Sequence, residues 1–381
     1  MKISRISVLI GVTTLLATST ATVAGAVPTK SDQIQAALSE TMELDRWPAA
    51  LVAVGGGSQE LRTYEAGVVE LGSTKEAEAK SQIRIGSSTK TFTAAVMMQL
   101  VAEDKVDLDQ TVESYLPGVL RHPDVKGEDI TVRHLLQHTS GLPDMSDDVA
   151  RNILEWQHRY ISPRASLDLA LTHPTTNAPG EFFQYSNANY ILAGLIIEAV
   201  SGRPLPEQID ERIITPLNLE NTYFPDQGEQ EIRGEHLHSY IPIGDPATDY
   251  TTFDPSWGYG AGAMISTVSD LTEFFSALAQ GDVVPADQLE EMQKTIPAAG
   301  PGVPADGALW EGTRYGLGLV SFELSCGGVA WGHGGDVPGT MSRVAATADG
   351  RAAAVAVTQN AVTAEGDPRL RALVDMAICE S

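Results

Sequence analysis

The spacing of apolar and polar residues predicts strands near both ends of the chain. Residues 49–54 and 60–70 alternate as strands do, and they follow a helical pattern over residues 31–44. Strand-like runs return in the C-terminal part, at residues 315–323, 329–331, 341–347 and 352–358. A final helix is predicted at residues 368–378.

The middle of the chain predicts helices and loops instead. Helical patterns cover residues 132–138, 166–172, 190–201, 205–214 and 267–280. A stretch rich in proline, glycine and alanine at 296–308 indicates a surface loop. This order predicts an α+β fold, in which an antiparallel sheet built from both ends of the chain is flanked by helices and carries an inserted all-helical domain.

The predicted domain boundaries follow from that order. Residues 27–105 and 262–381 are expected to form a discontinuous α/β domain, and residues 106–261 a mainly helical domain. The two terminal helices should pack on one face of the sheet. Small-molecule sites tend to form in the crevice between two such parts, so the active site is expected there.

Ser87 and Lys90 are the strongest candidates for catalytic chemistry. They follow a short strand predicted at 83–86 and open an apolar helix at 91–103. Positions i and i+3 share a helix face, so the lysine can reach the serine, whose hydroxyl needs a base before it attacks. Burial lowers a lysine pKa from about 10.4, which allows the neutral amine to be that base. A helix cap followed by a solvated lysine is the alternative.

Two further segments carry suitable side chains. Tyr185 and Asn187 stand between a Pro-Gly turn and a helix, a position that is also typical of capping. His333-Gly334-Gly335 follows a predicted strand, and its glycines allow a ligand to approach the backbone, although a turn with a hydrogen-bonded histidine fits the pattern too. His138-Thr139-Ser140 is interpreted as a helix end and turn, because the chain has no G-x-S-x-G elbow and adjacent residues on a turn seldom face each other.

The N-terminus has the pattern of an export signal. Lys2 and Arg5 precede an apolar stretch over residues 6–17, and small residues at 24–26 offer a cleavage site, so residues 1–26 are predicted to be a signal peptide. A transmembrane anchor is the alternative, but the apolar stretch is shorter than the roughly 20 residues that a span needs. We therefore expect a secreted, extracellular protein without a stable membrane anchor.

Charge and cysteine content narrow the possible partners. Fifty acidic against 25 basic residues give a net charge of −25, which argues against nucleic acid and fits a solubility charge. In an oxidising compartment, the two cysteines, Cys326 and Cys379, favour a disulfide over two free thiols. Without clustered histidines they make no metal site, and no cofactor is predicted. The expected partner is a small-molecule or peptide substrate, and the protein is expected to be a monomer.

Ser87-x-x-Lys90, Tyr185-x-Asn187 and His333-x-Gly335, in this order and at this spacing, resemble the motifs of the serine penicillin-recognising enzymes, which include the class C β-lactamases. Within that group the chain most resembles the secreted D-alanyl-D-alanine carboxypeptidases of Streptomyces, over nearly the whole mature sequence. The flanking segments that share the resemblance are 86–117, 132–142, Ser256-Trp257 with Gly262, 315–319 and the Cys326–Cys379 pair.

The resemblance implies a role for each candidate. Ser87 would be the acylated nucleophile, activated with the help of Lys90, and Tyr185 would carry protons to the leaving group and from the attacking water. Asn187 would bind the substrate amide and orient Lys90. His333 would line the opposite wall of the cleft and support the electrostatics near Tyr185. Whether Lys90 or Tyr185 is the acylation base stays open.

The resemblance also implies which residues bind substrate. These are Trp257, Gly334, Gly335 and Asp336. The backbone N–H groups of Ser87 and Asp336 would form the oxyanion hole, which stabilises the developing charge in acyl transfer.

The chain departs from the carboxypeptidases at two positions that hold the free carboxylate of their substrate. Where those enzymes carry an arginine and a hydroxyl, this sequence has Val320 and Asp336. Arg314 and Arg343 are close in sequence and are candidate replacements. The difference predicts a specificity that tolerates an amine, amide or ester end.

Three functions follow from these observations. The first is a D-alanyl-D-alanine carboxypeptidase-like serine peptidase that acts on peptidoglycan-type peptides and is acylated by β-lactams. The second is an esterase, D-aminopeptidase, amidase or β-lactamase on the same scaffold. The third is a non-catalytic penicillin-binding sensor, which would be expected to have lost some of the four catalytic side chains present here.

Overall fold

The computed structural model describes residues 30–299 and 312–380. The predicted signal peptide and much of the loop predicted at 296–308 lie outside these residues. No described helix has both the length and the apolar composition needed to cross a membrane.

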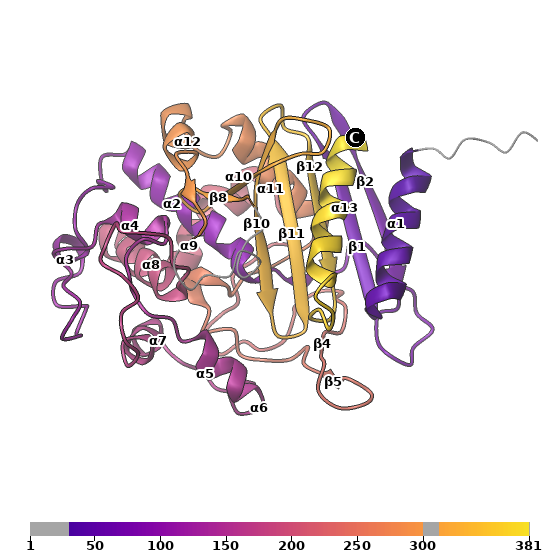
Figure 1. Ribbon diagram of the computed structural model, residues 1–381, viewed down its shortest axis with the longest axis horizontal. Helices are drawn as coiled ribbons and strands as arrows, with labels where there is room; N and C mark the ends of the chain where they lie inside the picture. The colour runs from indigo at the N-terminus through magenta and orange to yellow at the C-terminus, as the bar shows by residue number, and fades with distance from the viewer. Residues whose placement is uncertain (1–29, 300–311, 381) are drawn as a thin grey trace, which may run out of the picture.

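An eight-stranded antiparallel sheet joins the two ends of the chain, as predicted (Figure 1). β1 (Ala49–Gly56) pairs with β12 (Ala352–Val357), which places the first strand of the chain beside the last. The full order is β2 (Gln59–Gly67), β1, β12, β11 (Thr340–Thr347), β10 (Val329–Val337), β9 (Val320–Glu323), β8 (Arg314–Tyr315) and β7 (Ile296–Pro297).

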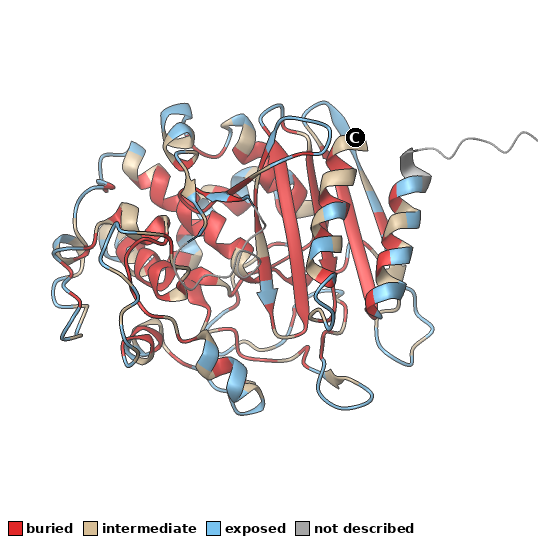
Figure 2. Cartoon of the chain, in the orientation of Figure 1, coloured by how far each residue is buried: buried red, intermediate tan, exposed pale blue. Residues whose placement is uncertain are grey.

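Helices cover both faces of this sheet. The terminal helices α1 (Lys30–Asp45) and α13 (Gly366–Glu380) pack together on one face, which confirms the prediction. α11 (Val268–Gln280) packs on the opposite face against β1, β11 and β12. The central strands β11 and β12 are therefore buried along their whole length (Figure 2).

The helical part lies beside the sheet on the α11 side (Figure 1). Its two long buried helices are α2 (Thr89–Ala102) and α8 (Asn187–Ser201), which pack against each other. The shorter helices are α3 (Val112–Tyr115), α4 (Val132–Leu136), α5 (Ser146–Arg151), α6 (Ile153–Trp156), α7 (Pro163–Ala170), α9 (Leu205–Ile209), α10 (Thr215–Leu217) and α12 (Ala286–Met292). One apolar cluster runs from Leu51 in β1 through Met98 in α2 to Ile197 in α8, so both parts share a core.

Short elements complete the chain. Two-residue strands pair as β3 (Ile83–Arg84) with β6 (Ile265–Ser266) and as β4 (Tyr240–Ile241) with β5 (Thr248–Asp249). The 3₁₀ turn η1 (Gly86–Ser88) carries Ser87, and the 3₁₀ turn η3 (Tyr259–Ala261) ends at Ala261, whose carbonyl oxygen contacts Lys90. The element η2 (Asp210–Ile214) is a π turn.

The structure corrects three predicted elements. Residues 315–323 form a hairpin of β8 and β9 rather than one strand, because Gly318 turns the chain at φ +74° at a place where a Cβ would collide with the Ala94 side chain. His333-Gly334-Gly335 belongs to β10 instead of following a strand. The helix predicted from residue 190 begins three residues earlier, at Asn187, so the backbone of this residue is part of α8.

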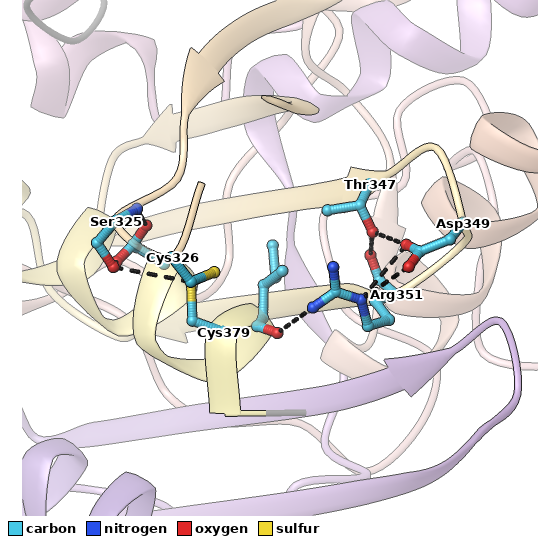
Figure 3. The surroundings of a disulfide bond; sticks show 8 residues. Ser325, Cys326, Thr347, Asp349, Arg351 and Cys379 are labelled. Atoms are coloured by element: carbon cyan, nitrogen blue, oxygen red, sulfur yellow. Dashed lines mark hydrogen bonds and ion pairs between the residues drawn. A yellow bond between two sulfur atoms is a disulfide. The ribbon is translucent and has the colours of Figure 1, made fainter. Parts of the chain in front are cut away.

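The predicted disulfide is present. Cys326, in the turn between β9 and β10, is bonded to Cys379 in α13, with a Cα–Cα distance of 5.7 Å (Figure 3). The bond joins the C-terminal helix to the sheet on the face that carries α1.

Candidate active site

Ser87 lies on the 3₁₀ turn that leads from β3 into α2. Gly86, just before it, has φ +51°, which a residue with a Cβ rarely adopts. A Cβ on Gly86 would also lie 2.9 Å from the backbone nitrogen of Asp336 in β10. The glycine therefore allows the turn with Ser87 to sit directly against the strand.

Lys90 points back from the first turn of α2 and is fully buried. Its Nζ lies 3.0 Å from Ser87 Oγ, 2.7 Å from Asn187 Oδ1 and 2.7 Å from the carbonyl oxygen of Ala261. Burial lowers the pKa of Lys90 to about 7, and the Asp144 carboxylate works in the opposite direction. The neutral amine of Lys90 has two N–H groups, which can donate to Asn187 Oδ1 and to the Ala261 carbonyl oxygen. Its lone pair then faces the Ser87 hydroxyl.

Tyr185 approaches the same serine from the segment before α8. Burial raises the pKa of the Tyr185 phenol well above its ordinary value; Tyr315 adds to this effect, and a hydrogen bond with Ser87 opposes it. The ring stacks on His138 at 4.2 Å between centroids, and Lys90 Nζ lies 4.8 Å from its centroid. A protonated phenol beside Ser87 is placed to donate a proton rather than to take one, so the geometry favours Lys90 as the base.

Asn187 is the first residue of α8 and links Lys90 to two residues that the sequence did not single out. Its Nδ2 donates to Asp144 Oδ2 at 3.1 Å and to Ser146 Oγ at 2.8 Å. Asp144 and Ser146 directly follow the 132–142 segment that carries part of the family resemblance. Two polar residues just after Pro143 were therefore the signal that could have found them.

His333 lies behind the site rather than on its open wall. It is buried in β10, and it is not among the residues that line the cleft. Nδ1 lies 2.6 Å from the Gly334 carbonyl oxygen, which can only accept, so Nδ1 carries the proton and Nε2 accepts from the Tyr315 hydroxyl at 3.0 Å. Burial lowers the pKa of His333 to about 3. The ring is therefore neutral and supplies no positive charge.

The two glycines after His333 serve the packing of β10. A Cβ on Gly335 would collide with the carbonyl oxygen of Ile85, and one on Gly334 would crowd the guanidinium of Arg343. Neither glycine lines the cleft, whereas Trp257 and Asp336 do. Of the four residues predicted to bind substrate, the cleft lining thus includes Trp257 and Asp336, and their contact with substrate stays a prediction.

The Asp336 side chain is held by Arg343. The two form ion-pair contacts of 2.9 and 3.2 Å, and Arg343, only 4% exposed, also pairs with Asp367 of α13 at 2.6 Å. Arg314 donates to Thr295 instead. Both arginines considered as carboxylate ligands are therefore committed to other groups. Val320 is buried beside Tyr315.

A cleft of about 250 Å³ opens over Ser87 and Asn187. One wall is apolar, with Val149, Ala150, Ile153 and Trp257, and Val337 and Pro338 also line the cleft. Among the described residues that line it, none is an arginine or a lysine. The described residues also contain no group of histidine, cysteine and carboxylate side chains that could hold a metal ion.

A family model described as Beta-lactamase matches residues 34–377. The chain belongs to the β-lactamase family. This β-lactamase family member is 34% identical to a D-stereospecific amidohydrolase from Streptomyces sp., with a TM-score of 0.80 over 93% of this chain and 100% of that one. It is 25% identical to a D-amino acid amidase from Ochrobactrum anthropi SV3, with a TM-score of 0.80 over 92% and 98% of the two chains.

Curated relatives of this β-lactamase family member match it over a shorter range. The D-alanyl-D-alanine-carboxypeptidase/endopeptidase AmpH of Escherichia coli is 27% identical over 65% of this chain and 61% of its own length. Protein flp of Staphylococcus aureus is 26% identical over 55% of this chain and 42% of its own length. The chain thus spans less than two thirds of either relative. The monomeric state stays a prediction.

Proposed function

We propose that this serine hydrolase is an amidase or peptidase for D-amino acid derivatives that lack a free carboxylate on the leaving side. The observation that carries the proposal is the cleft beside Ser87, whose described lining has no free cation. Asp336, at the position where the carboxypeptidases bind a carboxylate, brings a negative charge that Arg343 neutralises. The D-amidohydrolases among the structural relatives support the stereochemical part.

The reaction would run through an acyl-enzyme. Neutral Lys90 takes the Ser87 proton as Oγ attacks the substrate carbonyl, and the oxyanion faces the backbone N–H groups of Ser87 and Asp336. Tyr185 gives its proton to the leaving amine and is re-protonated from Lys90. Water then attacks the ester by the reverse proton path, which frees the acid product and restores Ser87.

The apolar wall favours substrates with an apolar side chain. Val149, Ile153 and Trp257 lie beside the nucleophile and offer no charged partner. A side chain of phenyl or isobutyl size would fill part of the 250 Å³ cleft and remove apolar surface from water.

The test compares kcat/KM for a D-phenylalanine amide or a D-residue peptide amide with the matching free acid. We expect the amide to be preferred by about tenfold or more, since an unpaired carboxylate in the cleft is costly. Asp336→Thr is the matched variant, because it removes the negative charge and supplies the hydroxyl of the carboxypeptidases, and it should move the preference towards the acid. Ser87→Ala should abolish turnover and also the mass increase after exposure to benzylpenicillin. A strong preference of the wild type for the free acid would refute the proposal.

D-alanyl-D-alanine carboxypeptidase activity is the second candidate. The observation in its favour is the similarity to AmpH, and the same comparison of acid and amide substrates decides between the two.

We also propose that the protein is exported, from the signal-like pattern of residues 1–26 and the disulfide. Recovery of disulfide-bonded protein from the culture medium, with an N-terminus near Val27, checks this. Protein that stays in the cytoplasm at full length would contradict it.

A further inference from the structure

Asp144 lies at the opposite end of the Asn187 amide from Lys90. Its Oδ2 accepts from Asn187 Nδ2 at 3.1 Å and from Ser146 Oγ at 2.9 Å. Its Oδ1 accepts from the backbone N–H of Met145 at 2.8 Å and from that of Asn187 at 3.3 Å. The carboxylate therefore joins the loop before α5 to the first residue of α8.

We propose that Asp144 is a positioning residue, which fixes Asn187 against Lys90 and sets how tightly Lys90 holds its proton. The proposal rests on the proposed role of Lys90 as the base. It adds a residue that lies outside the three motifs.

The hydrogen bonds fix the direction of the Asn187 side chain. An asparagine amide can turn either end towards a neighbour, and only its oxygen can accept from Lys90. Asp144 and Ser146 both accept from the Nδ2 end, and Ser146 Oγ in turn donates to Asp144. Both Nδ2 hydrogens of Asn187 therefore have acceptors, so the oxygen of Asn187 is held towards Lys90.

The charge of Asp144 matters because the other titratable groups around Lys90 are neutral. Burial raises the pKa of the two nearby phenols and lowers that of the two imidazoles. These rings are Tyr185, Tyr190, His138 and His333. Within the part of the chain that the structure describes, this leaves the Asp144 carboxylate as the charge that favours a protonated Lys90. It keeps the lysine able to take up and return a proton near neutral pH.

Asp144→Asn is the decisive variant, because it removes the charge at nearly constant shape. We expect the acid limb of kcat/KM for a chromogenic ester to move to lower pH, by on the order of one unit. We also expect kcat to fall by about tenfold or more, since the new amide cannot accept all the bonds that hold Asn187.

Ser146→Ala separates position from charge. It removes an acceptor for Asn187 but leaves the carboxylate, so kcat should fall while the acid limb stays in place. Asp144→Glu restores the charge and should return the acid limb towards that of the wild type. Asp147→Asn is the surface control, because this carboxylate lies on α5 with its side chain 79% exposed and pairs with Arg151.

A readout on the free enzyme keeps this proposal independent of the substrate. NMR titration of ¹³Cε-labelled lysine, with Lys90 assigned by Lys90→Arg, should show a lower midpoint in Asp144→Asn. Should that variant not fold, Asp144→Ser replaces it, since its hydroxyl still caps Met145. An unchanged Lys90 midpoint in a folded variant would overturn the proposal. So would a rise in KM alone, which would show that Asp144 contacts substrate instead.

Discussion

At the scale of single residues, the proposed mechanism depends on the protonation of one buried lysine. Burial lowers the pKa of Lys90 to about 7, while the pKa of Tyr185 is raised well above its usual range. The base should therefore be available above pH 7 and lost below it. We expect kcat/KM for an ester substrate to rise with pH through about 7 and then level off. A rise only at pH 10 or above would contradict the lowered pKa of Lys90.

The same shift predicts how stability depends on pH. In the unfolded chain Lys90 keeps its ordinary pKa, so between about 7 and 10.5 the unfolded state binds more protons than the folded state. Stability from this group therefore rises with pH across that window, and the cost of burying the charge is greatest below it. Lys90→Met should raise the Tm more at pH 6 than at pH 10. An equal gain at both pH values would contradict the lowered pKa.

The candidate catalytic residues could be named from the sequence because each stands in a short motif. Ser87 and Lys90 are three positions apart, on the 3₁₀ turn and the first turn of α2, and Tyr185 and Asn187 are two positions apart. Asp144 is different, because it meets Asn187 across 43 residues of chain. Only the packing of the loop before α5 against α8 brings the two together, and no local pattern encodes that contact.

At the scale of elements, periodicity predicted best where apolar residues recur regularly along the element. The helix predicted at 31–44 is α1 (Lys30–Asp45), and the strand predicted at 352–358 is β12 (Ala352–Val357). β10 was predicted too short because its second half, from His333 to Gly335, has no apolar side chain. In the structure these residues continue β10, and the missing Cβ at Gly335 leaves room for Ile85, just before α2, beside the strand backbone.

That approach gives a prediction for Gly335→Ala. The new Cβ would collide with the Ile85 carbonyl oxygen and push β10 away from the turn with Ser87. We expect a loss of stability of about 1–3 kcal/mol and a fall in kcat, because the Asp336 N–H moves away from the oxyanion. Acylation kinetics and thermal unfolding measure the two effects.

Gly202→Ala is the control for backbone strain alone. Gly202 ends α8 at φ +69° with open space where a Cβ would stand. Alanine there should cost about 1 kcal/mol of stability and leave kcat unchanged. If Gly335→Ala kept full kcat as well, the close approach of β10 would not matter for catalysis.

At the scale of the whole molecule, the order of elements predicted that the chain ends meet in one sheet. Strands near both ends, with helices between them, leave few other ways to bury the apolar faces. The sequence did not predict that the helical part would share one continuous core with the sheet through α2 and α11. That depends on how α2, assigned to the α/β domain, packs against α8.

The disulfide acts at this scale, because it ties the last helix to the sheet on the face opposite the active site. Cys326 and Cys379 close a loop with a sequence separation of 53, for which chain entropy predicts a stabilisation of about 4 kcal/mol. The double variant Cys326→Ser, Cys379→Ser should unfold at lower denaturant concentration than the oxidised wild type. Its kcat/KM under native conditions should be unchanged, since Ser87 lies on the other side of the sheet from the disulfide.

Adding a reductant should lower the Tm of the wild type and leave the Tm of the double variant unchanged. A wild-type Tm insensitive to a reductant that cleaves the bond would show that α13 is held by its apolar contacts with β11 and β12 alone.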